Sequence, residues 1–414
     1  MSEWRALSSI TSKIGSGSTP RGGNSVYSDS GISFIRSQNV LDMDFSTENL
    51  AFINDNQAEK LNNVIVEKND ILLNITGDSI TRCTVVPEEI LPARVNQHVS
   101  IIRCKNTEES KYVMYYLQYM KKYLLQISKV GGTRNALTKG AIGKLSIKIS
   151  DDCNKISKIL DNIDQKIQIN NQINQELETM AKTLYDYWFV QFDFPDQNGK
   201  SYKSSGGKMV YHPELKREIP EGWGVEKLGE LAQFKNGINY EKTSSGSEKV
   251  KIINVRNISS STIFINQTDL DEIFLESDKS TNFIVNEGMI LITRSGIPGA
   301  TRLVSGLETK TVYSGFIIAS EVNDLIYKNL IFYYLKNVEE VLKNQSAGTI
   351  MKNISQSVLT DMAVSLPPQN LLLKFNSIID NLFEQMKNVQ RQNQELTQLR
   401  DWLLPMLMNG QVII

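Results

Sequence analysis

Asn174-Gln175-Glu176-Leu177 recurs as Asn393-Gln394-Glu395-Leu396, 219 residues further along the chain. At the same shift, Leu160-Asp161-Asn162-Ile163 is matched by Ile379-Asp380-Asn381-Leu382. Trp4 matches Trp223 and Gly77 matches Gly296, again at 219. Tyr115–Leu117 returns as Tyr333–Leu335 and Gly132-Thr133 as Gly348-Thr349, with small drifts from this shift. Because separated matches in one order are the mark of an internal repeat, the chain is two copies of a unit of roughly 190 residues.

Each copy follows the same plan, a mixed globular part and then a long helix. The β-rich runs are Ile32–Ile35, Asp70–Leu73 and Val99–Ile102 in copy one, and Lys251–Asn254, Met289–Ile292 and Phe316–Ala319 in copy two. Copy one also has one clear helix around Tyr112–Leu125, and Pro367-Pro368 precedes the second long helix. The predicted parts are a first globular domain at 1–150, a long helix at 151–190, a linker at 191–221, a second domain at 222–366 and a second long helix at 367–414.

The two long helices, predicted over Asn154–Phe189 and Asn370–Met408, share an apolar spacing of four and three. The first seam is Ile156, Leu160, Ile163, Ile167, Asn170, Asn174, Leu177, Ala181 and Leu184. The second is Phe375, Ile379, Leu382, Met386, Val389, Asn393, Leu396, Arg400 and Leu403. Such spacing is typical of a coiled coil, and a buried asparagine at one seam position can set the register. The alternative is two amphipathic helices, each packed on its own domain.

The sequence contains no recognisable catalytic constellation. Its only histidines, His98 and His212, lack counterparts in the other copy, and we interpret His98 as a half-buried structural side chain. Three cysteines without zinc-ligand spacing indicate reduced thiols and no metal site. Neither a phosphate loop nor a dinucleotide fingerprint is present, and no apolar run approaches the ~20 residues of a membrane span. We therefore expect a cytoplasmic protein that is not an enzyme and holds no cofactor.

The loops of both copies repeat instead, with different residues at equivalent places. Glycine lets a backbone approach a partner, hydroxyl and cationic side chains contact phosphates, and Arg or Asn can read base edges. The candidate DNA-binding residues of copy one are Ser18, Thr19, Arg21, Thr76, Asp78, Ser79, Arg82, Thr133, Arg134, Asn135 and Lys139. Those of copy two are Thr293, Arg294, Ser295, Arg302, Thr349 and Lys352. Two similar scaffolds with different loops predict two different short targets.

Charge qualifies this prediction. The chain has 45 Lys and Arg against 46 Asp and Glu, a formal net charge of −1, whereas DNA-binding domains are often basic overall. Between Ser110 and Ser150, however, eight basic residues occur without any Asp or Glu. DNA affinity is therefore expected to come from local basic loops.

The stretch between the two copies carries the most specific resemblance. It contains Trp188-Phe189-Val190-Gln191-Phe192-Asp193-Phe194-Pro195, then Tyr202–Val210, and ends in Glu214–Trp223. This stretch resembles the central region of specificity subunits of Type I restriction-modification systems, and the tandem plan resembles that family over essentially the whole chain. The resemblance implies an α+β fold: two similar mixed α/β target-recognition domains separated by two long antiparallel helices that form a coiled coil, a pseudo-two-fold tandem repeat.

The resemblance also implies the partners. They are double-stranded DNA, two methyltransferase subunits that dock on this chain, and endonuclease-translocase subunits in the larger assembly. S-adenosylmethionine, Mg and ATP would be bound by those partners.

The length of the helices and the differing loops predict the kind of site. A helix from about residue 156 to 188 spans on the order of 48 Å, enough to address half-sites roughly one DNA turn apart. The differing loops predict an asymmetric bipartite site. The rival interpretations are a self-sufficient DNA methyltransferase or nuclease, and a structural coiled-coil protein.

Overall fold

The computed structural model describes residues 3–129, 135–240, 246–276, 280–345 and 354–412. They form two compact units. The first unit joins Met1–Gln172 to Gln390–Ile414, and the second unit is Ile173–Val389. Each unit therefore contains one mixed globular copy and a segment of both long helices.

The first unit is built on two sheets. The inner sheet has the strand order β2 (Thr11–Ser16), β10 (Val99–Cys104), β7 (Ile71–Asn74), β8 (Cys83–Val85). The outer sheet has the order β3 (Tyr27–Ser28), β5 (Ala51–Ile53), β4 (Ile32–Ile35), β9 (Ala93–Val95), β6 (Ile65–Val66). A separate pair joins β1 (Glu3–Ala6) to β11 (Ser146–Ile149). Every residue of β7 is buried, as its apolar run predicts for a central strand.

The short helices of the first unit are α1 (Leu7–Ile10), α2 (Asp55–Glu59), α3 (Ser110–Tyr119), α4 (Lys121–Ser128) and α5 (Lys139–Gly143). The single helix expected around Tyr112–Leu125 is thus two helices. The break is at Met120, whose ψ of 4° is not helical. One buried cluster lies under α3, and a second lies between the two sheets.

The second unit repeats this plan. Its inner sheet has the order β15 (Ala232–Asn236), β21 (Ile317–Val322), β18 (Ile290–Thr293), β19 (Thr301–Leu303). A second sheet has the order β17 (Asp271–Leu275), β16 (Glu248–Ile253), β20 (Thr311–Tyr313). The parallel pair of β16 and β20 corresponds to the parallel pair of β4 and β9 in the first unit. The mixed α/β repeat predicted from the sequence is therefore confirmed.

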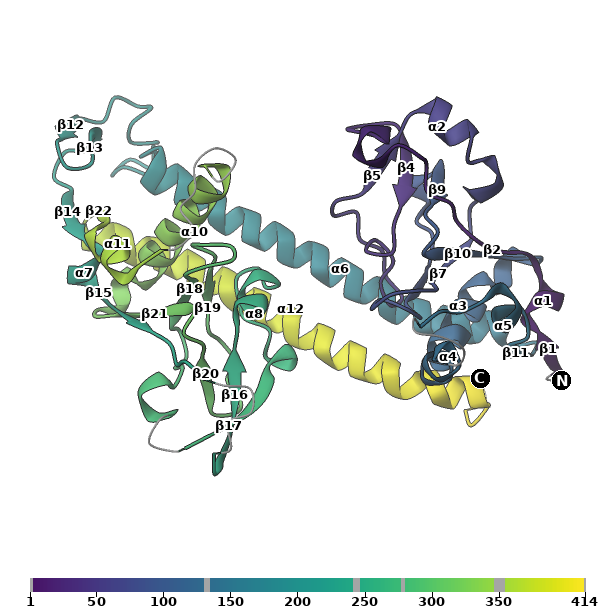
Figure 1. Cartoon of the computed structure of the whole chain (residues 1–414). Coiled ribbons are helices and arrows are strands. Elements are labelled where there is room, and N and C mark those ends of the chain that lie inside the picture. The colour runs from purple at the N-terminus through teal and green to yellow at the C-terminus, as the bar shows by residue number, and fades with distance from the viewer. Residues whose placement is uncertain (1–2, 130–134, 241–245, 277–279, 346–353, 413–414) are drawn as a thin grey trace. The chain divides into compact units, whose positions relative to one another are not determined.

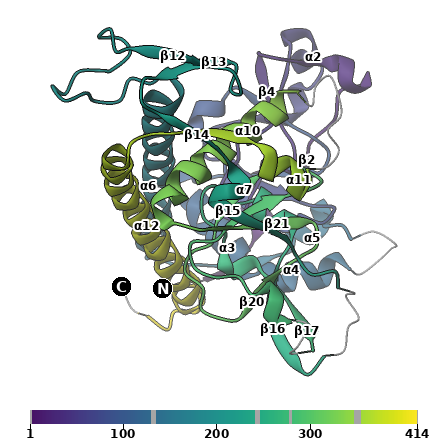
Figure 2. The ribbon, with the colours of Figure 1, turned by 90° about the vertical axis from the view of Figure 1, so that its left-hand side faces the viewer.

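The remaining elements of the second unit frame these sheets. They are β12 (Met209–His212), β13 (Arg217–Pro220), β14 (Gly224–Lys227), β22 (Ala363–Leu366), α7 (Leu228–Leu231), α8 (Val255–Ser259), α10 (Lys328–Gln345) and α11 (Gln356–Asp361). β12 pairs with β13 in a hairpin, and β14 pairs with β22. α7 and α11 lie side by side next to β15 (Figure 2).

The long helices are α6 (Cys153–Tyr185) and α12 (Gln369–Asn409), drawn in teal and yellow in Figure 1. A π-helical turn, Asp186–Val190, continues α6, so the predicted helix end at Phe189 falls inside this turn. Within the described ranges, none of the helices combines the length and apolarity that crossing a membrane requires.

Within each unit the two long helices pack antiparallel. In the first unit Asp164 of α6 pairs with Arg400 of α12, while Asn170, further along α6, pairs with the earlier Asn393. In the second unit the ring of Tyr185 lies against that of Phe375. The residues of both predicted seams are buried or half-buried.

Candidate nucleic-acid interface

In the first unit, three loops meet beside the inner sheet. The loop after β2 is bonded to the β9–β10 turn, since Gly17 N–H donates to Val99 O at 2.9 Å and Ser18 N–H to Val95 O at 3.0 Å. The loop after β7 joins the same turn, because Ile75 N–H donates to His98 O at 2.9 Å. Main-chain bonds thus hold loops from distant parts of the sequence as one cluster, called here the first loop cluster.

Gly17 is required by this close approach. A Cβ atom there would lie far inside van der Waals contact with the carbonyl oxygens of Val95 and Asn96. Backbone atoms cannot move aside as a flexible side chain can, so the loop depends on glycine.

A chain of four side chains links the three loops. The Thr19 hydroxyl donates to Gln97 Oε1, and Gln97 Nε2 donates to His98 Nε2 at 3.1 Å. With Nε2 accepting, His98 Nδ1 carries the ring proton and donates to Thr76 Oγ1 at 2.6 Å, a tautomer assigned from this network. Thr19 and Gln97 are exposed, and His98 and Thr76 are half-buried. The network presents hydroxyl and amide groups to solvent in a fixed arrangement.

The turn between β7 and β8 holds three further predicted residues. Gly77, with φ +79°, allows this turn. Asp78 is exposed, while Ser79 and Arg82 are half-buried. Asn74 Nδ2 donates to Ser79 Oγ at 3.1 Å, which ties the turn to the sheet.

A fourth segment, after α4, closes the cluster. Leu137 N–H donates to Ile75 O at 2.9 Å, and Ala136 forms a bridge with Thr76. The exposed Asn135 and Lys139 flank this contact. The predicted residues Thr133 and Arg134 lie outside the described residues. Of the others, Ser18 is half-buried and Arg21 is exposed.

The second unit repeats the main-chain pattern, in what is called here the second loop cluster. Gly237 N–H donates to Ile317 O at 3.0 Å, and Arg294 N–H donates to Phe316 O at 2.9 Å. The segment before α11 joins in, since Ile354 N–H donates to Arg294 O at 2.9 Å. A Cβ on Gly237 would strike the carbonyls of Tyr313 and Ser314, as one on Gly17 would strike those of Val95 and Asn96. The scaffold that carries the loops is therefore the same in both copies.

The side chains on that scaffold differ. Arg294 is half-buried, and its Nη1 donates to Gly315 O at 3.2 Å. The ring of Phe316 is 64% exposed at the position that His98 holds in the first unit. Ser295, on the adjoining loop, is half-buried.

Two predicted contact residues of copy two are buried and are removed from the candidate set. Thr293 has no exposed surface, and its Oγ1 accepts from Ala300 N–H at 3.0 Å. Arg302 is 6% exposed and forms an ion pair with Glu339 at 3.0 Å. Thr293 therefore holds the β18–β19 loop from within, and Arg302 joins β19 to α10. The predicted Thr349 and Lys352 lie outside the described residues.

The structure adds Gln97, His98 and Phe316 to the candidate contact residues; the sequence did not single out Gln97 or Phe316, and it indicated only a structural role for His98. The repeat alone gives only a weak signal here, because it places His98 against Ile317 at a shift of 219 and against Phe316 at a shift of 218. Two of the eight basic residues between Ser110 and Ser150 form ion pairs, Lys111 with Asp161 and Lys121 with Asp42, both at 2.6 Å.

The helix pair of the first unit contains a buried polar network. Tyr115 OH donates to Asp164 Oδ2 at 2.6 Å, and Arg400 Nη1 donates to Asp164 Oδ1 at 2.8 Å. Burial raises the pKa of the Asp164 carboxyl, and the bonds from Tyr115 and Arg400 oppose that rise. Nearby, Asn170 Nδ2 donates to Asn393 Oδ1 at 2.8 Å.

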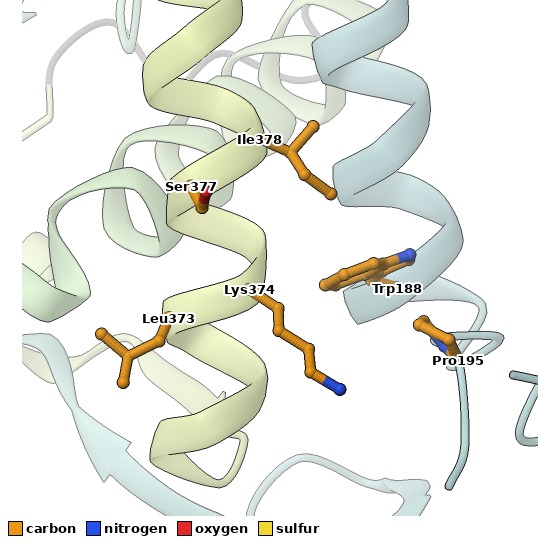
Figure 3. Close-up of a pocket in the computed structure, with 6 residues that line it drawn as sticks. All are labelled: Trp188, Pro195, Leu373, Lys374, Ser377 and Ile378. Atoms are coloured by element: carbon orange, nitrogen blue, oxygen red, sulfur yellow. The ribbon is translucent and has the colours of Figure 1, made fainter. Parts of the chain in front are cut away.

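In the second unit the helix pair ends beside a groove that is open to solvent. Its lining residues are Trp188, Pro195, Leu373, Lys374, Ser377 and Ile378. Figure 3 shows Lys374 and Ile378 projecting from α12 toward Trp188. Nowhere in the described part of the chain do His, Cys, Asp or Glu side chains gather as a metal site would require.

Comparison with known proteins connects this geometry to a family. The model described as "Type I restriction modification DNA specificity domain" matches residues 5–179 and again 220–398. The MjaIX specificity subunit of Methanocaldococcus jannaschii is 28% identical over 332 residues, 78% of this chain and 73% of that protein. The HindI specificity subunit of Haemophilus influenzae is 25% identical over 352 residues, 68% of this chain and 72% of that protein. An S subunit from M. genitalium has a similar fold, with a TM-score of 0.51, 15% identity, and coverage of 98% of this chain and 96% of that chain.

Proposed function

The chain belongs to the Type I restriction-modification DNA specificity family, and from this premise we propose that it reads an asymmetric, bipartite DNA sequence for a complex of methyltransferase and endonuclease subunits. DNA sequence recognition is the role of the family, and specificity subunits are not themselves enzymes. Each of the two matched domains would read one half-site.

One observation gives the main support for a bipartite DNA site. The two loop clusters share a main-chain bonding pattern, yet the first presents the Thr19–Gln97–His98–Thr76 network and the second presents Arg294 and Phe316. Equal scaffolds with unequal side chains favour two different half-sites, hence an asymmetric sequence. Hydroxyl groups and arginine in such loops suit phosphate and base-edge contacts.

The duplication also supports two copies of one docking partner. Met180 of α6 and Leu399 of α12 are equivalent at the 219-residue shift, and they are 56% and 44% exposed. Exposed apolar side chains at equivalent positions offer the same contact twice. Two methyltransferase subunits, one on each, fit this arrangement, and endonuclease-translocase subunits would join through the assembled complex.

The cofactors would then belong to the partners. We propose that S-adenosylmethionine is bound by the methyltransferase subunits, and ATP and Mg by the partner subunits. The assembly would work on DNA in the cytoplasm.

The test is the methylation pattern of cells with and without the gene. The expected result is one gene-dependent motif made of two different short halves around unspecified bases. A continuous or palindromic motif would contradict the proposal. Methyl transfer or cleavage by the purified chain alone would favour the rival enzyme interpretation.

A further inference from the structure

His98 and Phe316 occupy one backbone position in the two domains. Each carbonyl accepts a hydrogen bond at 2.9 Å from the loop after the central strand, from Ile75 and from Arg294. The carbonyl of the next residue accepts a hydrogen bond from a glycine in the loop after β2 or β15. Val99 O accepts from Gly17 N–H, and Ile317 O accepts from Gly237 N–H. Both side chains therefore stand where two candidate DNA loops meet.

The chemistry at this position is opposite in the two units. His98 is hydrogen-bonded on both ring nitrogens, to Gln97 and to Thr76. Phe316 has no polar atom, and its ring is 64% exposed beside a loop that carries Ile297, itself 41% exposed. A single exposed apolar residue is ordinary on a protein surface. Phe316, however, lies at the junction of two loops, and the equivalent position in the first unit holds a polar side chain.

The main chain next to Phe316 is held by both neighbouring loops. Gly315, just before it, donates its N–H to Ile238 O at 2.7 Å, and Gly315 O accepts from Arg294 Nη1. A Cβ atom on Gly315 would collide with the Asn239 side chain. The turn that presents Phe316 is therefore fixed from both loops before any ligand arrives.

We propose that Phe316 reads the 5-methyl group of a thymine in the half-site of the second domain, at the position where the first domain presents hydrogen-bonding groups through Gln97 and His98. This inference rests on the proposed function and adds the class of base to it. An apolar ring has nothing to offer a phosphate, whereas contact with the thymine methyl is the major-groove readout open to phenylalanine. The neighbouring Arg294 supplies the cation that anchors the same loop near the DNA backbone.

The test uses the complex assembled with its methyltransferase subunits and a DNA duplex that contains the motif identified by the methylation comparison. Each thymine of the second half-site is replaced in turn by deoxyuridine, which removes only the methyl group. One replacement is expected to weaken binding by the unaltered complex roughly three- to tenfold, on the scale of burying one methyl group. Phe316→Ala should weaken binding by a similar factor and should no longer respond to that replacement.

Two variants serve as controls. Phe274→Ala removes another exposed phenyl ring of the second unit, 50% exposed, and should keep the full response to deoxyuridine. Phe316→Leu keeps an apolar side chain and should keep part of the response of binding to deoxyuridine. Thermal unfolding of each variant separates loss of readout from loss of fold.

Several outcomes would overturn the inference. The first is a second half-site without thymine, and the second is a Phe316→Ala complex that still responds to deoxyuridine. The third is that Phe316→Ala weakens binding equally on all DNA sequences, as expected of a ring wedged between bases. The fourth is that Phe316→Ala impairs subunit assembly instead of sequence specificity. If the unaltered complex has a bipartite motif and one of these is observed, only this inference fails. If there is no such motif, the proposed function fails and the inference fails with it.

The first domain provides the reciprocal measurement. His98→Ala should relax base preference at one position of the first half-site and leave the second half-site unchanged. His212→Ala, which removes the chain's other histidine from the β12–β13 hairpin, should change neither half.

Discussion

At the scale of single residues, each loop cluster depends on a glycine, because a side chain at that position would prevent two main chains from lying in contact. Gly17 and Gly237 let a loop lie directly on a neighbouring main chain, where a methyl group would meet two carbonyl oxygens. Gly15, two residues earlier in β2, has open space where its Cβ would be. The same kind of residue is thus indispensable at one place and replaceable two positions away.

Gly17→Ala is therefore expected to destabilise the first unit by about 1–3 kcal/mol, the usual range for overpacking, and to impair recognition of the first half-site. Gly15→Ala is the matched control and should change the free energy of unfolding by less than about 1 kcal/mol. Denaturant unfolding of both variants measures the difference. Equal stability of the two would show that the loop relaxes without strain.

At the scale of elements, the long helices are packed by polar contacts in the first unit and by apolar contacts at the equivalent positions of the second unit. In the first unit Tyr115, Asp164 and Arg400 form a buried polar network. The equivalent positions at the repeat shift are Tyr333, Phe383 and Ala181, and in the second unit Tyr333 stacks on Phe383 at 6.1 Å. The Tyr333 hydroxyl is buried without a hydrogen-bond partner among the described residues.

Arg400→Met should destabilise the chain by about 3–5 kcal/mol, because it leaves the buried Asp164 carboxylate without its opposite charge. The pKa of Asp164, already raised by burial, should rise further. A carboxyl whose folded pKa lies above its unfolded pKa of about 3.9 makes its full contribution to stability at pH values below the unfolded pKa. This contribution is lost as pH rises through the folded pKa. The variant should therefore lose stability from acid toward neutral pH, as measured by unfolding at several pH values.

The double variant Asp164→Phe with Arg400→Ala is the control, because it copies the apolar solution of the second unit. It is expected to recover most of the stability that Arg400→Met loses, since well-packed apolar groups can replace a buried ion pair. A double variant less stable than the single one would contradict this explanation.

Partner docking is also tested on these helices. Met180→Asp and Leu399→Asp should each remove one methyltransferase subunit from the complex, and the double variant should remove both. Gln175→Asp and Gln394→Asp place the same charge at equivalent positions five residues away, roughly 140° around each helix, and serve as controls. Mass measurement of the complexes gives the stoichiometry. Loss of both subunits in a single variant would argue against two independent sites.

At the scale of the whole molecule, the net charge of −1 limits what the chain can do alone. Attraction to DNA rises with the number of phosphates that cations neutralise, and two lysines of the first domain, Lys111 and Lys121, pair with carboxylates. DNA binding should therefore depend on the assembled complex.

The isolated chain is expected to bind non-specific DNA weakly, and the complex is expected to bind its motif with an affinity that falls as salt rises. Fluorescence anisotropy at two or more salt concentrations measures both. Tight, salt-dependent binding of random DNA by the isolated chain would show that its local basic loops are sufficient.

The sequence by itself determined the duplication, the long helices, their seams and the family. These are features of order and period, which a chain displays before it folds. The loop residues could be proposed only as a set, because exposure depends on what covers each one. Thr293 and Arg302, for example, carry the right chemistry in the right loop and are buried.

Only the tertiary structure decided which residues meet. The repeat aligns Asn393 with Asn174, yet Asn393 is hydrogen-bonded to Asn170 and Asn171. The two helices run antiparallel, so residues that are equivalent in the repeat do not lie opposite each other. Likewise, the equivalence of His98 and Phe316 rests on main-chain hydrogen bonds between loops that are distant in sequence. Periodicity is local and can be read along the chain, whereas contact between distant loops depends on how the sheets bring them together.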